Sequence, residues 1–93
     1  MAKIRFGAVL RERRAGKGWT QEQMATQADL STRYIQALEA AEKAPSLETV
    51  FKIARAFGTS PGALLEPLWR EWKESKLSSS AKPEPASGRD VKL

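Results

Sequence analysis

The sequence of 93 residues contains no cysteine and no histidine. Such a chain forms no disulfide, offers no thiolate or imidazole to a metal ion, and lacks the Ser/His and Cys/His pairs of many nucleophilic enzymes. It also lacks an apolar run close to the roughly 18 to 20 residues that span a bilayer, and its N-terminus lacks the apolar core of a secretory signal. These absences predict a cytoplasmic protein that is not an enzyme and needs no metal or cofactor.

Positive charge is in excess and is unevenly distributed. Sixteen Lys and Arg residues against eleven Asp and Glu residues give a net charge of +5, and 41% of the residues are hydrophobic. Residues 1–33 hold seven basic and three acidic side chains, a net +4, whereas residues 34–93 hold nine and eight, a net +1. One small soluble domain with an anionic partner, such as nucleic acid or a membrane surface, is therefore expected.

Capping residues and apolar spacing predict four helices in the first 58 residues. Thr20 and Gln23 have the spacing of a capping box, and Ser31 and Ser46 suit the N-cap positions of the helices that follow them. Glycine, which suits the residue after a helix, stands at positions 16, 18 and 58. The expected helices are Ile4 to Ala15, Gln21 to Ala28, Thr32 to Ala40 and a fourth from Ser46 to Gly58 with an apolar stripe of Leu47, Val50, Ile53, Ala54 and Phe57.

Two prolines define the C-terminal part. Pro61, after Ser60, suits the first position of a fifth helix, where the missing N–H costs no hydrogen bond. Pro67 would remove a bond inside that helix, so a kink or a restart is expected there, with two pieces at about 61–66 and 67–77. Residues 78–93 hold two large aliphatic side chains and are expected to be a disordered tail, or alternatively a segment that docks on a partner.

The second and third expected helices have the arrangement of a helix-turn-helix, in which the second helix of the pair enters the major groove of DNA. An ordered set of residues spans this pair and its neighbours: Leu10, Arg11, Arg14, Thr20 to Ala25, Ser31 to Ile35, Leu38, Glu39, Pro45 to Leu47, Ile53, Ala54, Phe57, Gly58, Leu64 and Leu65. In this set the chain closely resembles the Cro/CI-like, or XRE-type, helix-turn-helix family over roughly residues 4 to 66. The resemblance implies an all-α, five-helix, lambda-repressor-like domain over residues 1–66. Residues 67–77 depart from the family pattern, because they lie beyond the minimal domain, and are expected to form a helical extension that serves dimerisation.

Residues near the start of the third helix are the candidates for base contact. They are Ser31, Thr32, Arg33, Gln36 and Ala37. Arg33 is the strongest candidate because a guanidinium can donate to both O6 and N7 of guanine. The alternatives are that Arg33 contacts phosphate alone and that Gln36 points away from the DNA.

Three further residues are candidates for phosphate contact. Gln21 begins the second helix, where the free N–H groups and the helix dipole favour an anion. Tyr34 could place its hydroxyl on a phosphate, or could pack at the rim of the domain. Lys43 resembles the residue that makes a second phosphate contact in the family. The alternative is that Lys43 contacts only solvent.

Arg14 and Glu39 lie on faces that are otherwise apolar. The family resemblance implies that they form a partly buried ion pair between the first helix and the end of the third. Two residues after Glu39 the family pattern has a glycine, whereas this chain has Ala41. Because alanine is disfavoured at positive φ by about 1 kcal/mol, we expect the third helix to run longer or to end differently.

The expected function is that of a transcriptional regulator. A single module contacts few bases, so a homodimer on an inverted repeat of double-stranded DNA is expected, with a repressor-like role. The apolar residues that exceed the needs of one small core are assigned to the dimer interface: Phe51, Leu65, Leu68, Trp69 and Trp72. The two tryptophans could instead cover the core of the monomer. The competing function is a protein-interaction module, such as an antitoxin or adaptor, in which DNA binding is secondary.

Overall fold

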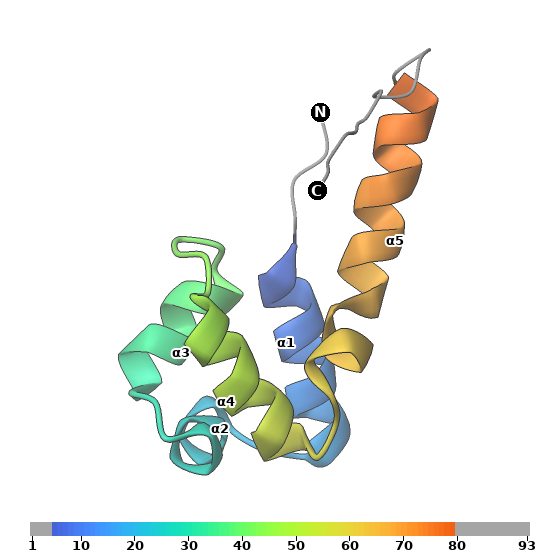
Figure 1. Cartoon of the computed structure of the whole chain (residues 1–93). Helices are drawn as coiled ribbons and strands as arrows, with labels where there is room; N and C mark the ends of the chain where they lie inside the picture. The colour runs from blue at the N-terminus through green and yellow to red at the C-terminus, as the bar shows by residue number, and fades with distance from the viewer. Residues whose placement is uncertain (1–4, 80–93) are drawn as a thin grey trace.

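The computed structural model describes residues 5–79, and within this range it contains five α-helices and no strand (Figure 1). This confirms the all-α fold. The helices are α1 (Phe6–Lys17), α2 (Gln21–Ala28), α3 (Thr32–Glu39), α4 (Leu47–Phe57) and α5 (Pro61–Ser79). In this part of the chain no helix is both long and apolar enough to cross a membrane.

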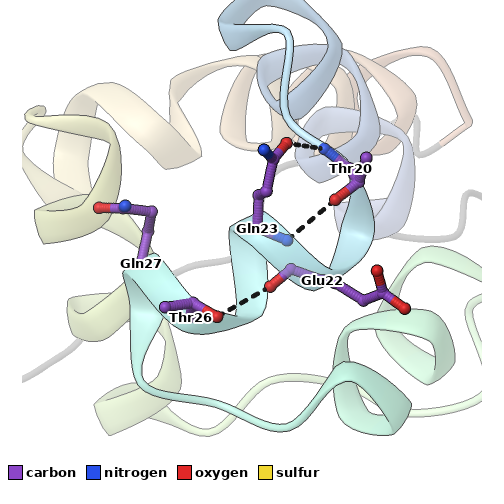
Figure 2. Close-up of a pocket in the computed structure, with 5 residues that line it drawn as sticks. All are labelled: Thr20, Glu22, Gln23, Thr26 and Gln27. Atoms are coloured by element: carbon purple, nitrogen blue, oxygen red, sulfur yellow. Dashed lines mark hydrogen bonds between the residues drawn. The ribbon is translucent and has the colours of Figure 1, made fainter.

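Side-chain caps begin four of the helices, as the sequence predicts. At the start of α2, the Thr20 hydroxyl accepts the Gln23 N–H at 3.0 Å, and the Gln23 side chain accepts the Thr20 N–H at 2.8 Å, which completes the capping box (Figure 2). The hydroxyls of Ser31, Ser46 and Ser60 accept the N–H of the residue three positions further on. These bonds satisfy N–H groups that a helix leaves without a partner in its first turn.

The end of α3 contradicts the expectation drawn from Ala41. The helix ends at Glu39, and Ala41 adopts a φ of 64°, the left-handed conformation that a glycine would provide at lower cost. The N–H of Glu42 donates to the Ala37 carbonyl at 2.8 Å, and the N–H of Ala41 donates to the Leu38 carbonyl at 3.1 Å. These two bonds form a Schellman motif, which holds Ala41 in this conformation despite the steric cost.

The fifth helix is a single element from Pro61 to Ser79, so the expected restart at Pro67 is wrong. Proline has no N–H to donate to the carbonyl of Ala63, but the helix continues through it to Ser79. The helix therefore includes positions 78 and 79, which the sequence analysis placed in the tail. The rest of the expected tail, residues 80–93, and the expected helical position of Ile4 lie outside the described residues.

All five helices contribute to one hydrophobic core. Helix α1 packs against α3 and α5, α2 packs against α3 and α4, and α4 packs against α5. The largest fully buried side chains are Leu10, Met24, Ile35, Leu38, Ile53 and Leu64. Leu47, which the sequence analysis placed on the apolar stripe of α4, is instead 68% exposed. Trp19 packs at the edge of the core with its ring stacked on Phe57, the ring centroids 5.6 Å apart.

Gly7 allows the close approach of α1 to the end of α3. A Cβ atom at this position would lie 2.4 Å from the Leu38 carbonyl oxygen and 2.7 Å from the Glu39 carbonyl oxygen. Both neighbours are backbone atoms, which cannot move away by changing rotamer. The first helix therefore sets the position of the C-terminal end of α3 by direct contact between backbones.

Gly7→Ala should lower the free energy of unfolding by about 1 to 3 kcal/mol, because the added methyl group forces α1 and α3 apart. Gly16→Ala is the matched control, since a Cβ at Gly16 would meet no atom within 4 Å. In that control the higher helix propensity of alanine should raise stability by about 0.5 to 1 kcal/mol. Urea unfolding followed by circular dichroism measures both, and equal effects of the two substitutions would contradict the close approach.

Candidate nucleic-acid interface

Helices α2 and α3 form the helix-turn-helix pair that the sequence predicts. Asp29, at a φ of 58°, ends α2, and Ser31 caps α3, so only three residues separate the helices. Helix α3 packs on α1 and α2 and lies on the side of the bundle away from the C-terminal half of α5 (Figure 1). One face of α3 consequently remains open to solvent.

The open face of α3 is a stripe of three residues. Arg33, Gln36 and Ala40 are exposed and follow one another at intervals of three and four, the spacing of one helix face. Thr32 is half-buried beside them, and Ser31 is exposed while its Oγ caps the helix. The structure thus places four of the five candidate base-contacting residues at the N-terminal end of α3 or on its exposed face.

Ala37, the fifth candidate, does not lie on the exposed face of α3. Its side chain is 7% exposed, because α3 is covered on two sides by α1 and α2 and the open stripe is narrow. Ala40, one turn beyond Gln36, holds the exposed position that the sequence analysis gave to Ala37. Helical spacing alone does not distinguish the two alanines, because Arg33, Ala37 and Ala40 are spaced as regularly as Arg33, Gln36 and Ala40; the burial of residues 37–39 does.

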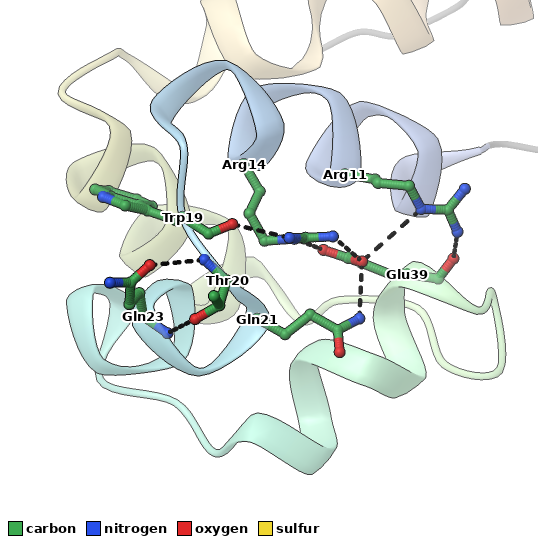
Figure 3. A network of polar contacts seen from close by, with 7 residues as sticks. All are labelled: Arg11, Arg14, Trp19, Thr20, Gln21, Gln23 and Glu39. Carbon is green, nitrogen blue, oxygen red and sulfur yellow. Dashed lines mark hydrogen bonds and ion pairs between the residues drawn. The ribbon is translucent and has the colours of Figure 1, made fainter.

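An ion pair joins α1 to the end of α3 (Figure 3). The Arg14 Nε donates to the Glu39 Oε2 at 2.6 Å, and the Arg14 Nη2 donates to Oε1 at 3.1 Å, which makes the pair bidentate. The Glu39 side chain is 3% exposed and that of Arg14 is 18% exposed. Arg14 Nη1 also donates to the Trp19 carbonyl at 2.9 Å, so that one guanidinium holds both α3 and the α1–α2 loop.

Two more side chains converge on Glu39. The Gln21 Nε2 donates to the Glu39 Oε1 at 3.0 Å, and the Arg11 Nη2 donates to the Glu39 main-chain carbonyl at 3.0 Å (Figure 3). Arg11 Nε also lies 3.8 Å from the carboxylate. Gln21, the candidate phosphate contact at the start of α2, is thereby tied to the end of α3, and α1, α2 and α3 meet at one carboxylate.

The side chains around Glu39 determine whether its carboxyl group is ionised. Burial alone would raise its pKa, but hydrogen bonds from Arg14 and Gln21 and the positive charges of Arg14 and Arg11 outweigh burial and hold the pKa of Glu39 below its ordinary value. The hydrogen bond from Glu39 correspondingly raises the pKa of Arg14. Both groups are therefore charged at neutral pH.

The other two candidate phosphate contacts differ in their surroundings. The Tyr34 side chain is half-buried against the core, and its hydroxyl lies 3.2 Å from the hydroxyl of the buried Thr49, to which the Ser46 hydroxyl donates at 2.9 Å. This chain of hydroxyls connects α3 to the start of α4 at the rim of the domain. Lys43 is exposed in the loop between α3 and α4, directly after the left-handed turn at Ala41.

The residues assigned to dimerisation divide into two groups. Phe51, Trp69 and Trp72 are 50%, 51% and 39% exposed, so each ring has a large part of its surface open to solvent. Leu68 is 7% exposed and belongs to the core cluster, and Leu65 is partly buried against that cluster. Both leucines lie on α5, which packs on α1 and α4.

Sequence reasoning missed two residues that position α3. Gly7 provides the close approach, and Arg11, which the sequence analysis named only among the residues of the family resemblance, donates to the last carbonyl of the helix. A signal for both exists, since positions 7, 11 and 14 have the spacing of one face of α1 and Arg14 is part of the family pattern.

The fold and this surface define a helix-turn-helix protein. A family model described as helix-turn-helix matches residues 10–64, which is more than half of the chain. The chain therefore belongs to this family, the XRE-type helix-turn-helix proteins, which are DNA-binding transcriptional regulators. No curated protein matches the sequence.

Solved structures with the same fold include three regulators. The restriction-modification controller protein C.AhdI from Aeromonas hydrophila is 34% identical, with 66% of this chain and 92% of that chain covered and a TM-score of 0.62. The hypothetical transcription factor NHTF from Neisseria is 31% identical, with 77% and 85% covered and a TM-score of 0.66. The clp gene regulator ClgR from Corynebacterium glutamicum is 28% identical, with 82% and 85% covered and a TM-score of 0.63.

Because the pKa of Glu39 is lowered in the folded state, the stability it contributes should be complete above its unfolded pKa of about 4.3 and should disappear as the pH falls through the lower folded value. Glu39→Gln should therefore make the unfolding free energy less dependent on pH below about pH 5 than in the wild type. Urea unfolding at a series of pH values measures this difference. If the unfolding free energies of the two proteins change with pH in the same way, protonation of Glu39 does not account for the loss of stability at low pH.

Proposed function

We propose that this chain is a sequence-specific regulator of transcription that binds double-stranded DNA as a homodimer, with α3 in the major groove of each half of an inverted repeat. The observation that carries the proposal is the exposed stripe of Arg33, Gln36 and Ala40 along α3, whose C-terminal end is fixed by three partners of Glu39. A major groove about 12 Å wide accepts one helix, and a rigid helix keeps its leading side chains in register with the bases.

Arg33 has the central role in this proposal. It is the one basic residue between Gln21 and Glu39, it is exposed, and it lies in the first turn of α3. Its guanidinium donates to O6 and N7 of a guanine, with Thr32 and Gln36 contacting adjacent bases. Ala40 has a short side chain that lets the DNA approach closely.

Contacts with the DNA backbone position this helix. The N-terminus of α2, at Gln21, offers free N–H groups and a positive dipole to one phosphate, and Lys43 offers a cation to another. Because the Gln21 amide also donates to Glu39, the same carboxylate that holds α3 orients this clamp. A repressor-like role follows from occupancy, since a dimer bound over a promoter blocks access to it and needs no further surface.

Selection of duplexes from a random pool tests the proposal. We expect the bound sequences to converge on an inverted repeat whose half-sites lie about one helical turn apart, as a two-fold dimer requires. The competing function, a protein-interaction module, is favoured by the exposed tryptophans of α5. It would be supported, and the proposal contradicted, if the pool showed no enrichment at salt concentrations where the protein is folded.

Arg33→Ala and Lys43→Ala each remove one exposed cation, and they should have different effects on the selected duplex. Arg33→Ala should weaken binding to it by about 1 to 3 kcal/mol per lost guanine contact, and should weaken binding to a scrambled duplex much less. Lys43→Ala should weaken binding to both duplexes alike and reduce the salt dependence. Fluorescence anisotropy at several salt concentrations measures both, and equal losses on both duplexes for Arg33→Ala would refute its base contact.

A further inference from the structure

An apolar groove of about 390 Å³ lies beside the exposed tryptophans of α5. Its walls come from the start of α1, the end of α3, the loop before α4, and α5. The side chains that matter for the following argument are Phe6, Leu38, Ala44, Pro45, Leu65 and Leu68. The groove is therefore built from segments far apart in the sequence and is open to solvent.

A ridge continues this groove along α5. Leu65, Trp69 and Trp72 follow one another at intervals of four and three, so they share one face of the helix. Leu65 lines the groove, whereas Trp69 and Trp72 lie beyond it, half-exposed, with ring centroids 5.8 Å apart. The C-terminal half of α5 extends beyond the other four helices (Figure 1).

The concave groove and the convex ridge are both apolar and lie next to each other on one face of the protein. Two copies of this face can therefore fit together, each ridge against the other copy's groove. We propose that the groove receives the tryptophan ridge of a second copy of this chain, and this inference rests on the homodimer of the proposed function. In a two-fold antiparallel pair of α5 helices centred between Leu68 and Trp69, Trp72 of one copy lies opposite Leu65 of the other. Each ridge then enters the groove of the other copy, as an isologous interface requires.

The surface area that a stable dimer must bury indicates that the groove takes part in the contact between the two copies. A fully buried tryptophan contributes about 150 to 250 Å², so two that are half-exposed offer roughly 200 Å². A stable interface buries about 800 Å² on each partner. The tryptophans alone are too small, and the groove walls supply adjoining apolar surface.

Charges at the edges are compatible with this arrangement. The groove has Glu42 and Lys43 in its lining, one charge of each sign, so this edge presents no net charge to the apolar ridge.

The groove also connects dimerisation to DNA binding. Leu38 in its wall belongs to α3, and the loop that contains Lys43 forms its edge. A tryptophan in the groove packs against the loop in which Ala41 is held at an unfavourable φ. The dimer contact thus supports the loop that the proposed function assigns to a phosphate.

A double-mutant cycle tests the contact between ridge and groove. Trp69→Ala/Trp72→Ala removes the ridge, and Ala44→Arg places a long charged side chain in the groove. Each should raise the dimer dissociation constant by tenfold or more in sedimentation equilibrium, and their combination should raise it by less than the product of the separate effects, because both remove the same contact. Ala44→Ser and Gln27→Arg, the latter adding a positive charge on the exposed side of α2, should leave it unchanged.

The outcomes separate this inference from the proposed function. If the ridge variant weakens the dimer and Ala44→Arg does not, the dimer stands and the groove proposal is overturned; the groove proposal is also overturned if the two effects multiply. If the wild type stays monomeric but still selects a DNA site, the homodimer and the groove contact fail while DNA recognition stands. All altered positions are exposed, and a thermal melt of each variant as a monomer verifies folding, with a melt close to wild type expected.

Discussion

The buried carboxylate of Glu39 is the interaction on which the arrangement of the three N-terminal helices depends. Arg14 from α1 and Gln21 from α2 both donate to it, and Arg11 holds the main-chain carbonyl of the same residue. A buried charge with one partner removed is strongly unfavourable, so each of these contacts constrains the others. The result is that α3 has one position relative to α1 and α2, which a helix that enters a DNA groove requires.

The contacts at the end of α3 combine several types of interaction within a few residues. Gly7 lets the α1 backbone approach two carbonyls of the helix, and the Schellman bonds at Ala41 turn the chain away from it. The alanine at this turn is less favourable than glycine by about 1 kcal/mol, and the bonds around it maintain the conformation nevertheless. The loop that follows therefore starts from a defined point, and it carries both Lys43 and one wall of the apolar groove.

The two ends of the domain have different surfaces. The open stripe of α3 is polar and narrow, with Arg33 as its cation, whereas α5 exposes two stacked tryptophans next to a groove. In the proposed dimer the first surface contacts DNA and the second contacts the other copy. Because the groove includes Leu38, both surfaces involve residues of α3.

The sequence alone determined the first four helices, most of their ends and the helix-turn-helix, because caps, glycines and apolar spacing act between residues close together in the chain. The pair of Arg14 and Glu39 also followed, through the family resemblance. The tertiary structure decided which faces are covered: it buries Ala37 and Leu68, exposes Ala40 and Leu47, and carries α5 through Pro67. Burial depends on contacts between distant segments, such as the meeting of Gly7 with α3, and no local pattern contains that information.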